Sequence, residues 1–107
     1  MALRLNGPWQ DLGKADGLPG HMGVFQLGDV QRQVIYIGYA GGRSLFGLRG
    51  EVAAAALRLH GARSYRVEVT TAYLSRWQEL LMVHRADHGE LPVGNEPVPR
   101  LGRLHPV

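Results

Sequence analysis

Cysteine is absent from this 107-residue sequence, which excludes a disulfide framework and a thiolate zinc site. Long hydrophobic runs are also lacking, since stretches such as residues 52–57 are far shorter than the roughly 20 residues of a membrane-spanning helix. No charged start followed by an apolar stretch marks a signal peptide. We therefore expect a cytoplasmic protein without a membrane partner.

Lysine is nearly absent, because among the 12 Lys and Arg residues only Lys14 is a lysine. The arginine guanidinium is a planar fork of donors that matches phosphate oxygens two at a time. A formal net charge of +3 also favours polyanions. A GC-rich genome produces the same arginine bias, so composition alone does not establish a nucleic-acid partner.

The length and the hydrophobic content indicate one domain, residues 1–107, that buries a real core. Frequent Gly and Pro predict an irregular lead-in over about the first 20 residues. Prolines 92, 97, 99 and 106 forbid regular structure in most of the tail. The core of the domain is therefore expected over about residues 18–96.

Three strands are predicted from short β-rich runs at residues 22–27, 34–37 and 64–69. Residues 28–33 join the first two strands as a hairpin, and the third alternates as a half-buried strand does. The glycine-rich residues 38–42 should turn the chain. The strands thus form a small, mostly antiparallel sheet.

Two helices are predicted to flank this sheet. The first spans residues 45–60 with Gly61 as its cap, and its apolar face is formed by Leu45, Leu48, Val52, Ala55 and Leu59. The second begins at a cap on Thr70 or Thr71, ends at His88 and is stopped by Gly89. The expected fold is α/β of the α+β kind, in the order ββαβα with a coil tail.

The second helix carries an informative carboxylate, Glu79. Glu79 points away from the broad apolar face of the helix. On its own side of the helix, however, the apolar residues Met82 and Val83 follow three and four positions later. Such a carboxylate lies in a partly dry groove and needs a partner. That partner is either a metal ion or a neighbouring guanidinium, of Arg76 or Arg85, and periodicity leaves both open.

The same helix also carries a histidine pair, and a glycine-rich turn precedes the first helix. His84 and His88 are one helical turn apart, a spacing that can bind zinc. Because His84 falls on the apolar face, a packed core histidine is favoured. The turn at residues 38–42 lacks the Lys-Ser/Thr ending of a nucleotide-binding loop, so a flexible turn is favoured, with contact between its amides and a nucleic-acid phosphate as the alternative.

Several of these segments occur in the order of one known family. The first segment is residues 18–25, which end in Gly23-Val24-Phe25. The second segment, Tyr36-Ile37-Gly38, begins after ten intervening residues. A helix with an Arg, an alternating strand, a helix with Glu79 and a coil with Asn95 come next. The sequence from about residue 18 to 96 therefore resembles the GIY-YIG endonuclease superfamily.

The resemblance implies metal-dependent cleavage of a phosphodiester bond in nucleic acid, most directly DNA. Glu79 would hold one Mg²⁺ or Mn²⁺ ion, and Tyr36 would position or deprotonate the attacking water. The phosphate clamp maps to Arg49, with Arg43 as the runner-up. Asn95 would brace the site by hydrogen bonds.

The resemblance also implies a substrate surface, formed by Gly38, Tyr39, Arg43 and Phe25. A homodimer would supply a second cut. Independently of the resemblance, the tail arginines Arg100 and Arg103 suit either contact with a nucleic-acid backbone or a solvated, partly disordered end, and both stay open. The central expectation is spatial: Glu79 should face Tyr36 across a positively charged cleft.

One departure from the family pattern matters, because Phe25 replaces its first tyrosine and has no hydroxyl to shuttle a proton. Tyr39 is the candidate substitute. Two alternatives therefore stay open beside the nuclease. The first is a catalytically weak or inactive nucleic-acid-binding domain, and the second is a protein-interaction domain.

Overall fold

A computed structural model describes residues 4–99 and 101–102. The expected contact of Arg100 and Arg103 with a nucleic-acid backbone lies outside the described residues. Within them, no helix is both long and apolar enough to cross a membrane.

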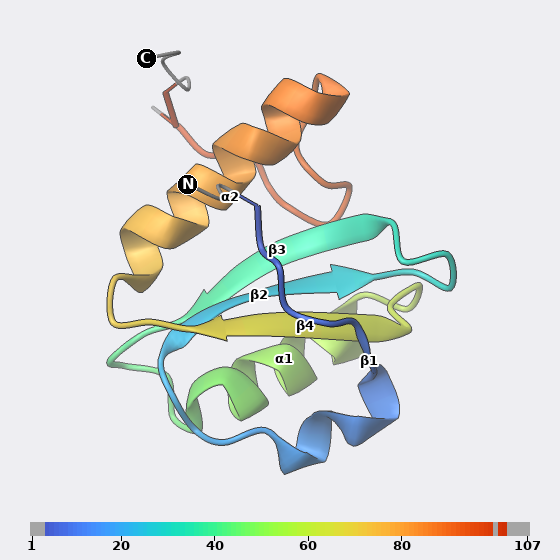
Figure 1. Ribbon diagram of the computed structural model, residues 1–107, viewed down its shortest axis with the longest axis vertical. Helices are drawn as coiled ribbons and strands as arrows, with labels where there is room; N and C mark the ends of the chain where they lie inside the picture. Colours follow the sequence, from blue (N-terminus) through green and yellow to red (C-terminus); the bar gives the residue numbers. More distant parts are fainter. Residues whose placement is uncertain (1–3, 100, 103–107) are drawn as a thin grey trace.

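The described chain forms a four-stranded antiparallel sheet with helices on both faces (Figure 1). The elements, in chain order, are β1 (Gln10–Asp11), the 3₁₀ helix η1 (Leu12–Gly17), β2 (Gly23–Gly28), β3 (Val34–Ala40), α1 (Gly47–Arg58), β4 (Ser64–Val69) and α2 (Tyr73–His88). The expected α+β class, its hairpin and its order of main elements are confirmed.

The strand order is β1-β4-β2-β3, so β2 is central and β3 is an edge strand. The sheet has one strand more than predicted. Residues Gln10 and Asp11 pair with Tyr65 and Ser64 as a short β1. Two residues are too few to show a periodic pattern, which is why the lead-in looked irregular.

Strand β3 is longer than predicted and runs through Gly38 to Ala40. Gly38 pairs with Phe25 across the hairpin, and a Cβ at Gly38 would lie 2.5 Å from Cζ of Phe25 and 2.7 Å from Cε2 of Tyr36. Two aromatic rings therefore cover the backbone at Gly38 and leave no space for a side chain. Gly38 lies within the strand and does not begin a turn.

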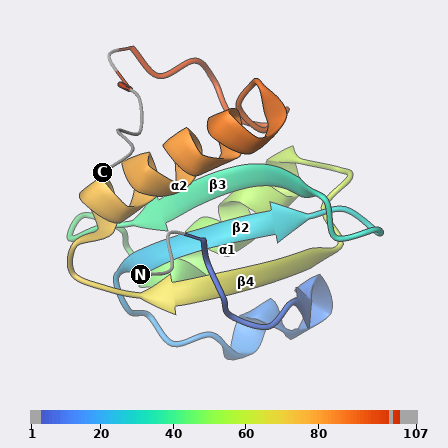
Figure 2. The ribbon, with the colours of Figure 1, turned by 45° about the horizontal axis from the view of Figure 1, so that its top comes forward.

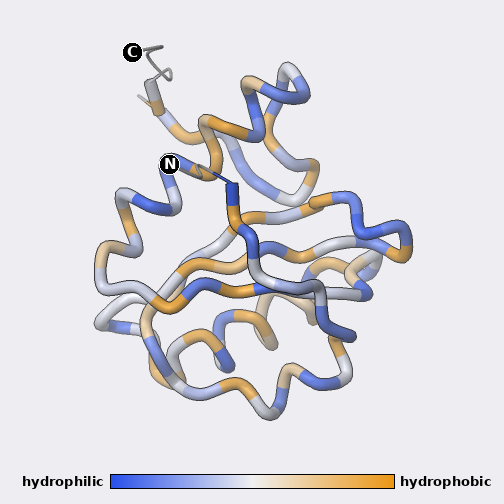
Figure 3. The backbone as a smooth tube through the Cα atoms, in the orientation of Figure 1, coloured by the Kyte–Doolittle hydropathy of each residue, from blue (hydrophilic) through white to orange (hydrophobic). Residues whose placement is uncertain are grey.

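The sheet separates two hydrophobic clusters, because alternate residues of a strand point to opposite faces. Phe25 and Leu27 pack with α1, whereas Val24 and Ile37 pack with α2. Figures 1 and 2 show the two helices on opposite sides of the sheet. All of β2 is buried between them, and hydrophobic residues recur along its trace (Figure 3).

The helix boundaries differ slightly from the prediction. Helix α1 starts at Gly47, and Leu45 lies outside it with 85% of its surface exposed. The helix ends at Arg58, so Gly61 is not its cap. Helix α2 starts at Tyr73 without a threonine cap, but it ends as predicted, with Gly89 in the left-handed conformation.

Candidate functional site

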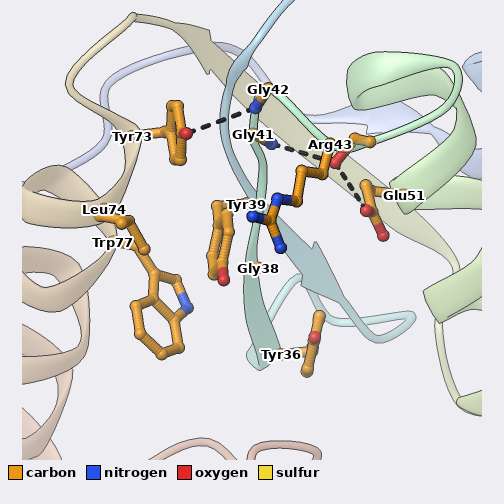
Figure 4. A pocket seen from close by; sticks show the side chains of 11 residues that line it. Tyr36, Gly38, Tyr39, Gly41, Gly42, Arg43, Glu51, Tyr73, Leu74 and Trp77 are labelled. Carbon is orange, nitrogen blue, oxygen red and sulfur yellow. Dashed lines mark hydrogen bonds between the residues drawn. The ribbon is translucent and has the colours of Figure 1, made fainter.

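Two hollows lie beside the edge strand β3. The first, which we call the glycine-turn hollow, has a volume of about 700 Å³ and is lined by Tyr36, Gly38, Tyr39, Gly41, Gly42, Arg43, Ser44, Glu51, Tyr73, Leu74 and Trp77 (Figure 4). The second, the proline hollow, measures about 530 Å³ and is lined by Tyr36, Arg58, Trp77, Gly94, Asn95, Glu96, Pro97, Val98 and Pro99. Because both contain Tyr36 and Trp77, we treat them together as the β3-edge groove.

The groove forms here because both faces of the sheet become accessible at its edge. Tyr36 points to the face that α1 covers, where it packs on the cluster of Phe25 and Leu27. Trp77 comes from α2 on the opposite face, and its Nε1 donates a hydrogen bond of 3.0 Å to the carbonyl oxygen of Ile37. The two rings thus enclose β3 from both sides.

Tyr36 is held between an aromatic ring and a cation. Its ring centroid lies 5.9 Å from that of Phe25, and the guanidinium carbon of Arg58 lies 5.0 Å above the ring. The Tyr36 hydroxyl makes no hydrogen bond with any residue of the described chain. It therefore remains available to a ligand.

The turn after β3 is ordered by a chain of hydrogen bonds (Figure 4). The Gly41 amide donates to Oγ of Ser44 at 3.0 Å, and that hydroxyl donates to Oε2 of Glu51 at 2.8 Å. The Gly42 amide donates to the Tyr73 hydroxyl at 3.3 Å. Both glycine amides are thus engaged within the protein, and the alternative that this turn leaves them open to a phosphate is wrong.

Three aromatic side chains form a continuous wall in the glycine-turn hollow. The centroids of Tyr39 and Tyr73 lie 5.7 Å apart with nearly parallel rings. The Trp77 ring meets Tyr39 edge-on at 5.1 Å. We call Tyr39, Tyr73 and Trp77 the aromatic wall.

The described residues that line the groove are formally neutral when taken together. Arg43 and Glu51 line the first hollow, and Arg58 and Glu96 line the second. Counted over residues 4–99 and 101–102, the cleft therefore carries no net positive charge, whereas the sequence led us to expect a positively charged cleft. The ion pairs found among the described residues involve only Arg4 and Arg76 as cations, so Arg43 and Arg58 are not held by a carboxylate.

Glu79 lies outside the groove and does not line it with Tyr36. Its carboxylate is ion-paired with Arg76, which also bonds Glu68 of β4 at 2.8 Å. The hydrogen bond to Glu68 is the main cause that raises the pKa of Arg76 above its ordinary value. The sequence left either a metal ion or a neighbouring arginine as the partner of Glu79, and in the structure the partner is Arg76.

The expectation that Glu79 faces Tyr36 is therefore wrong, and strand alternation is the reason. Helix α2 packs on the face of the sheet that Ile37 covers, whereas Tyr36, one residue earlier, points to the other face. The α2 residue that bonds to β3 beside Tyr36 is Trp77, through the carbonyl oxygen of Ile37.

The divalent cation implied by the family resemblance does not fit the residues around Glu79. A guanidinium already occupies this carboxylate, and a cation beside it would be repelled. Residues 4–99 and 101–102 contain no group of three His, Asp or Glu side chains that could hold a metal ion.

The other predicted residues are distributed inside and outside the groove. Tyr36, Gly38, Tyr39 and Arg43 line the glycine-turn hollow. Arg49 does not; it is exposed on α1, with its guanidinium carbon 5.6 Å from the centroid of the Phe46 ring.

Phe25 is 1% exposed, so it cannot touch a ligand and instead supports the ring of Tyr36. Asn95 lines the proline hollow and braces β3. Its Oδ1 accepts from the Ile37 amide and its Nδ2 donates to the Ile37 carbonyl, both at 2.9 Å.

The histidine pair lies on the far part of α2, away from the groove. The rings of His84 and His88 are 4.3 Å apart, and Nδ1 of His84 contacts the carbonyl oxygen of Glu90 at 3.0 Å. Burial lowers the pKa of His84. His84 is thus packed only at the margin: it is half-buried and belongs to neither hydrophobic cluster, so it is not the core histidine that the sequence favoured.

Sequence reasoning missed Glu51 and Arg58 as groove residues. They are seven positions apart on α1, a spacing that places both on the same helical face, and this signal was available. Trp77 was also missed as a groove residue. Its position at the edge of β3 depends on how α2 crosses the sheet.

The fold and the groove define a small antiparallel α+β domain that opens an aromatic-walled, formally neutral groove at the edge of its sheet. Residues 3–87 match the family described as domain of unknown function, DUF7508, and the chain belongs to this family. The match includes every residue that lines the glycine-turn hollow, whereas residues 94–99 of the proline hollow lie beyond it. A comparison with curated proteins finds no match.

Proposed function

We propose that this chain is a nucleic-acid-binding domain whose ligand lies in the β3-edge groove. The observation that carries the proposal is the placement of Arg43 and Arg58 in the two hollows on either side of Tyr36, with neither side chain in an ion pair. Free guanidinium groups are suited to bidentate contacts with phosphate oxygens. The resemblance to the GIY-YIG superfamily supports the same partner, because its second motif, at residues 36–38, forms part of the groove.

Binding without cleavage is the function that the geometry supports best. Glu79 is engaged by Arg76 outside the groove, and Phe25 has no hydroxyl. The groove contains three tyrosine hydroxyls, those of Tyr36, Tyr39 and Tyr73, of which the last accepts a hydrogen bond from the Gly42 amide, together with two arginines. This arrangement can hold a phosphate but has no evident means to supply a metal-activated water.

The neutral groove predicts modest affinity with weak dependence on salt. Arg43 and Arg58 offer about two phosphate contacts, so the slope of log K against log salt concentration should be about −1.4 for a single strand. A broad basic surface would give a much steeper slope, and its arginines would contribute independently of the groove.

Fluorescence anisotropy with labelled oligonucleotides, at salt concentrations from about 50 to 200 mM, tests the proposal. We expect Arg43→Gln and Arg58→Gln each to weaken binding and to reduce the salt slope by about 0.7. Arg32→Gln, which removes the same charge from the tip of the exposed hairpin, is the matched control and should change little. An absence of binding by the wild type, or an equal loss in the Arg32 variant, overturns the proposal.

A further inference from the structure

The aromatic wall has one feature that a purely structural cluster would lack. Tyr39 is 37% exposed although it belongs to a strand, and its neighbour Leu74 is 49% exposed. Both belong to the same hollow as Trp77 and Arg43. Apolar and aromatic surface that stays open beside a free cation is typical of a ligand site and untypical of a core.

The chemistry of this wall favours a ligand with a flat face. Tyrosine and tryptophan rings stack nucleobases of any sequence, and an arginine beside them can hold the adjoining phosphate. The hollow, at about 700 Å³, lies within the range of pockets that hold small organic ligands. It is large enough for one nucleotide unit.

Stacking on a protein ring requires a base whose face is free. In a duplex, each face is covered by the neighbouring base pair, and moving a base out of the stack costs free energy. Among the described residues, the groove contains only two cations outside ion pairs, Arg43 and Arg58, with which to offset that cost. A single strand presents its bases without this penalty.

We propose that the β3-edge groove selects single-stranded nucleic acid, with an unpaired base stacked on the ring of Tyr39 beside the edge-on ring of Trp77, and a phosphate held by Arg43. This inference rests on the proposed function, because it assigns the ligand class of the same groove. The Tyr73 hydroxyl, bonded to the Gly42 amide, fixes the far side of the wall to the turn.

The test compares a labelled single strand of about 12 nucleotides, without self-complementarity, with the same strand annealed to its complement. We expect the single strand to bind the wild type at least tenfold more tightly. Tyr39→Leu, which keeps bulk but removes the ring, should weaken single-strand binding about tenfold or more. Tyr39→Phe, which keeps the ring, should retain binding and shows that the loss in the leucine variant is due to stacking.

A second readout reports on the stacked base directly. The sequence has two tryptophans, so a Trp9→Phe background leaves Trp77 as the sole indole emitter. Single-strand binding should quench its fluorescence, and circular dichroism confirms that each variant is folded.

The two proposals fail in different ways. If duplex binds as tightly as the single strand, or if Tyr39→Leu leaves binding unchanged while Arg43→Gln weakens it, the stacking inference is wrong and the proposed function stands. If neither ligand binds, the proposed function is wrong as well.

Discussion

The side chains of Trp77 and Asn95 donate hydrogen bonds to the same acceptor, the main-chain carbonyl oxygen of Ile37, at 3.0 and 2.9 Å. A helix and a coil segment thereby close the outer side of the edge strand at one residue. Asn95 also accepts from the Ile37 amide, so its carboxamide replaces a neighbouring strand at this point. The groove lies along the edge that these two side chains define.

Asn95→Ala should destabilise the protein, because it removes two hydrogen bonds to Ile37 in a partly buried position. We expect a loss of roughly 1–3 kcal/mol in the free energy of unfolding, measured by urea denaturation. Glu96→Ala, at the exposed neighbouring position, serves as the control and should change stability by less than about 0.5 kcal/mol. Equal effects of the two changes would contradict the bracing role of Asn95.

Gly38→Ala should destabilise the protein by about 1–3 kcal/mol, because the new methyl group would overlap the rings of Phe25 and Tyr36. Relief of this overlap moves Tyr36, so ligand binding should weaken in the same variant. Gly13→Ala, where no atom lies within 4 Å of the added carbon, is the control. Thermal and urea unfolding measure both variants, and a stable Gly38→Ala protein would contradict the packing described here.

Glu51→Gln should strengthen nucleic-acid binding. The amide oxygen can still accept the hydrogen bond of Ser44, but the groove gains one net positive charge. We expect severalfold tighter binding at low salt and a loss of this gain at high salt, because screening weakens the added attraction. The control is Glu90→Gln, which changes the net charge equally outside the groove; an equal gain in both variants would indicate a general charge effect.

The endonuclease prediction made from the family resemblance is tested by plasmid nicking with Mg²⁺ or Mn²⁺. We expect no difference between the wild type and Glu79→Ala, since Arg76 engages this carboxylate away from Tyr36. Phe25→Tyr should not create activity, and burial of its hydroxyl at a position 1% exposed should cost about 1–3 kcal/mol of stability without a partner. Nicking that is present in the wild type and lost in Glu79→Ala would restore the metal hypothesis.

Stability should fall in acid partly through His84. Burial lowers the pKa of His84, so the unfolded chain binds a proton more readily than the folded one once the pH falls below about 6.5. The free energy of unfolding therefore decreases as pH falls from that value to the folded pKa. In His84→Gln this decrease should be shallower, whereas His60→Gln, at an exposed position, should retain it; identical pH profiles of wild type and His84→Gln would refute the assignment.

Local patterns determined most of the elements. Alternation predicted β4 at its observed bounds, and Gly89 ended α2 as expected, because both signals depend on neighbouring residues alone. The fourth strand was missed, since β1 has two residues and exists only by pairing with β4. Gly38 was read as a turn residue, although the rings that require glycine there come from its partner strand and from Tyr36.

The candidate site was predictable only in part. The short segment from Tyr36 to Arg43 is continuous in sequence, and four of its predicted residues line one hollow. Arg49 and Glu79 were placed there through the resemblance, and the structure brings neither to the groove. Arg49 and Glu79 lie away from the groove because of the face that α1 and α2, respectively, pack against the sheet.

The sequence by itself determined an antiparallel α+β domain, a Tyr-Ile-Gly strand and an arginine-rich charge, because hydrophobic period and residue chemistry are local properties. Only the tertiary structure decided that β3 lies at the sheet edge and that Trp77 occupies the place expected for Glu79. The reason is geometric: α1 and α2 pack on opposite faces, and alternation along β3 directs Tyr36 and Ile37 to different helices.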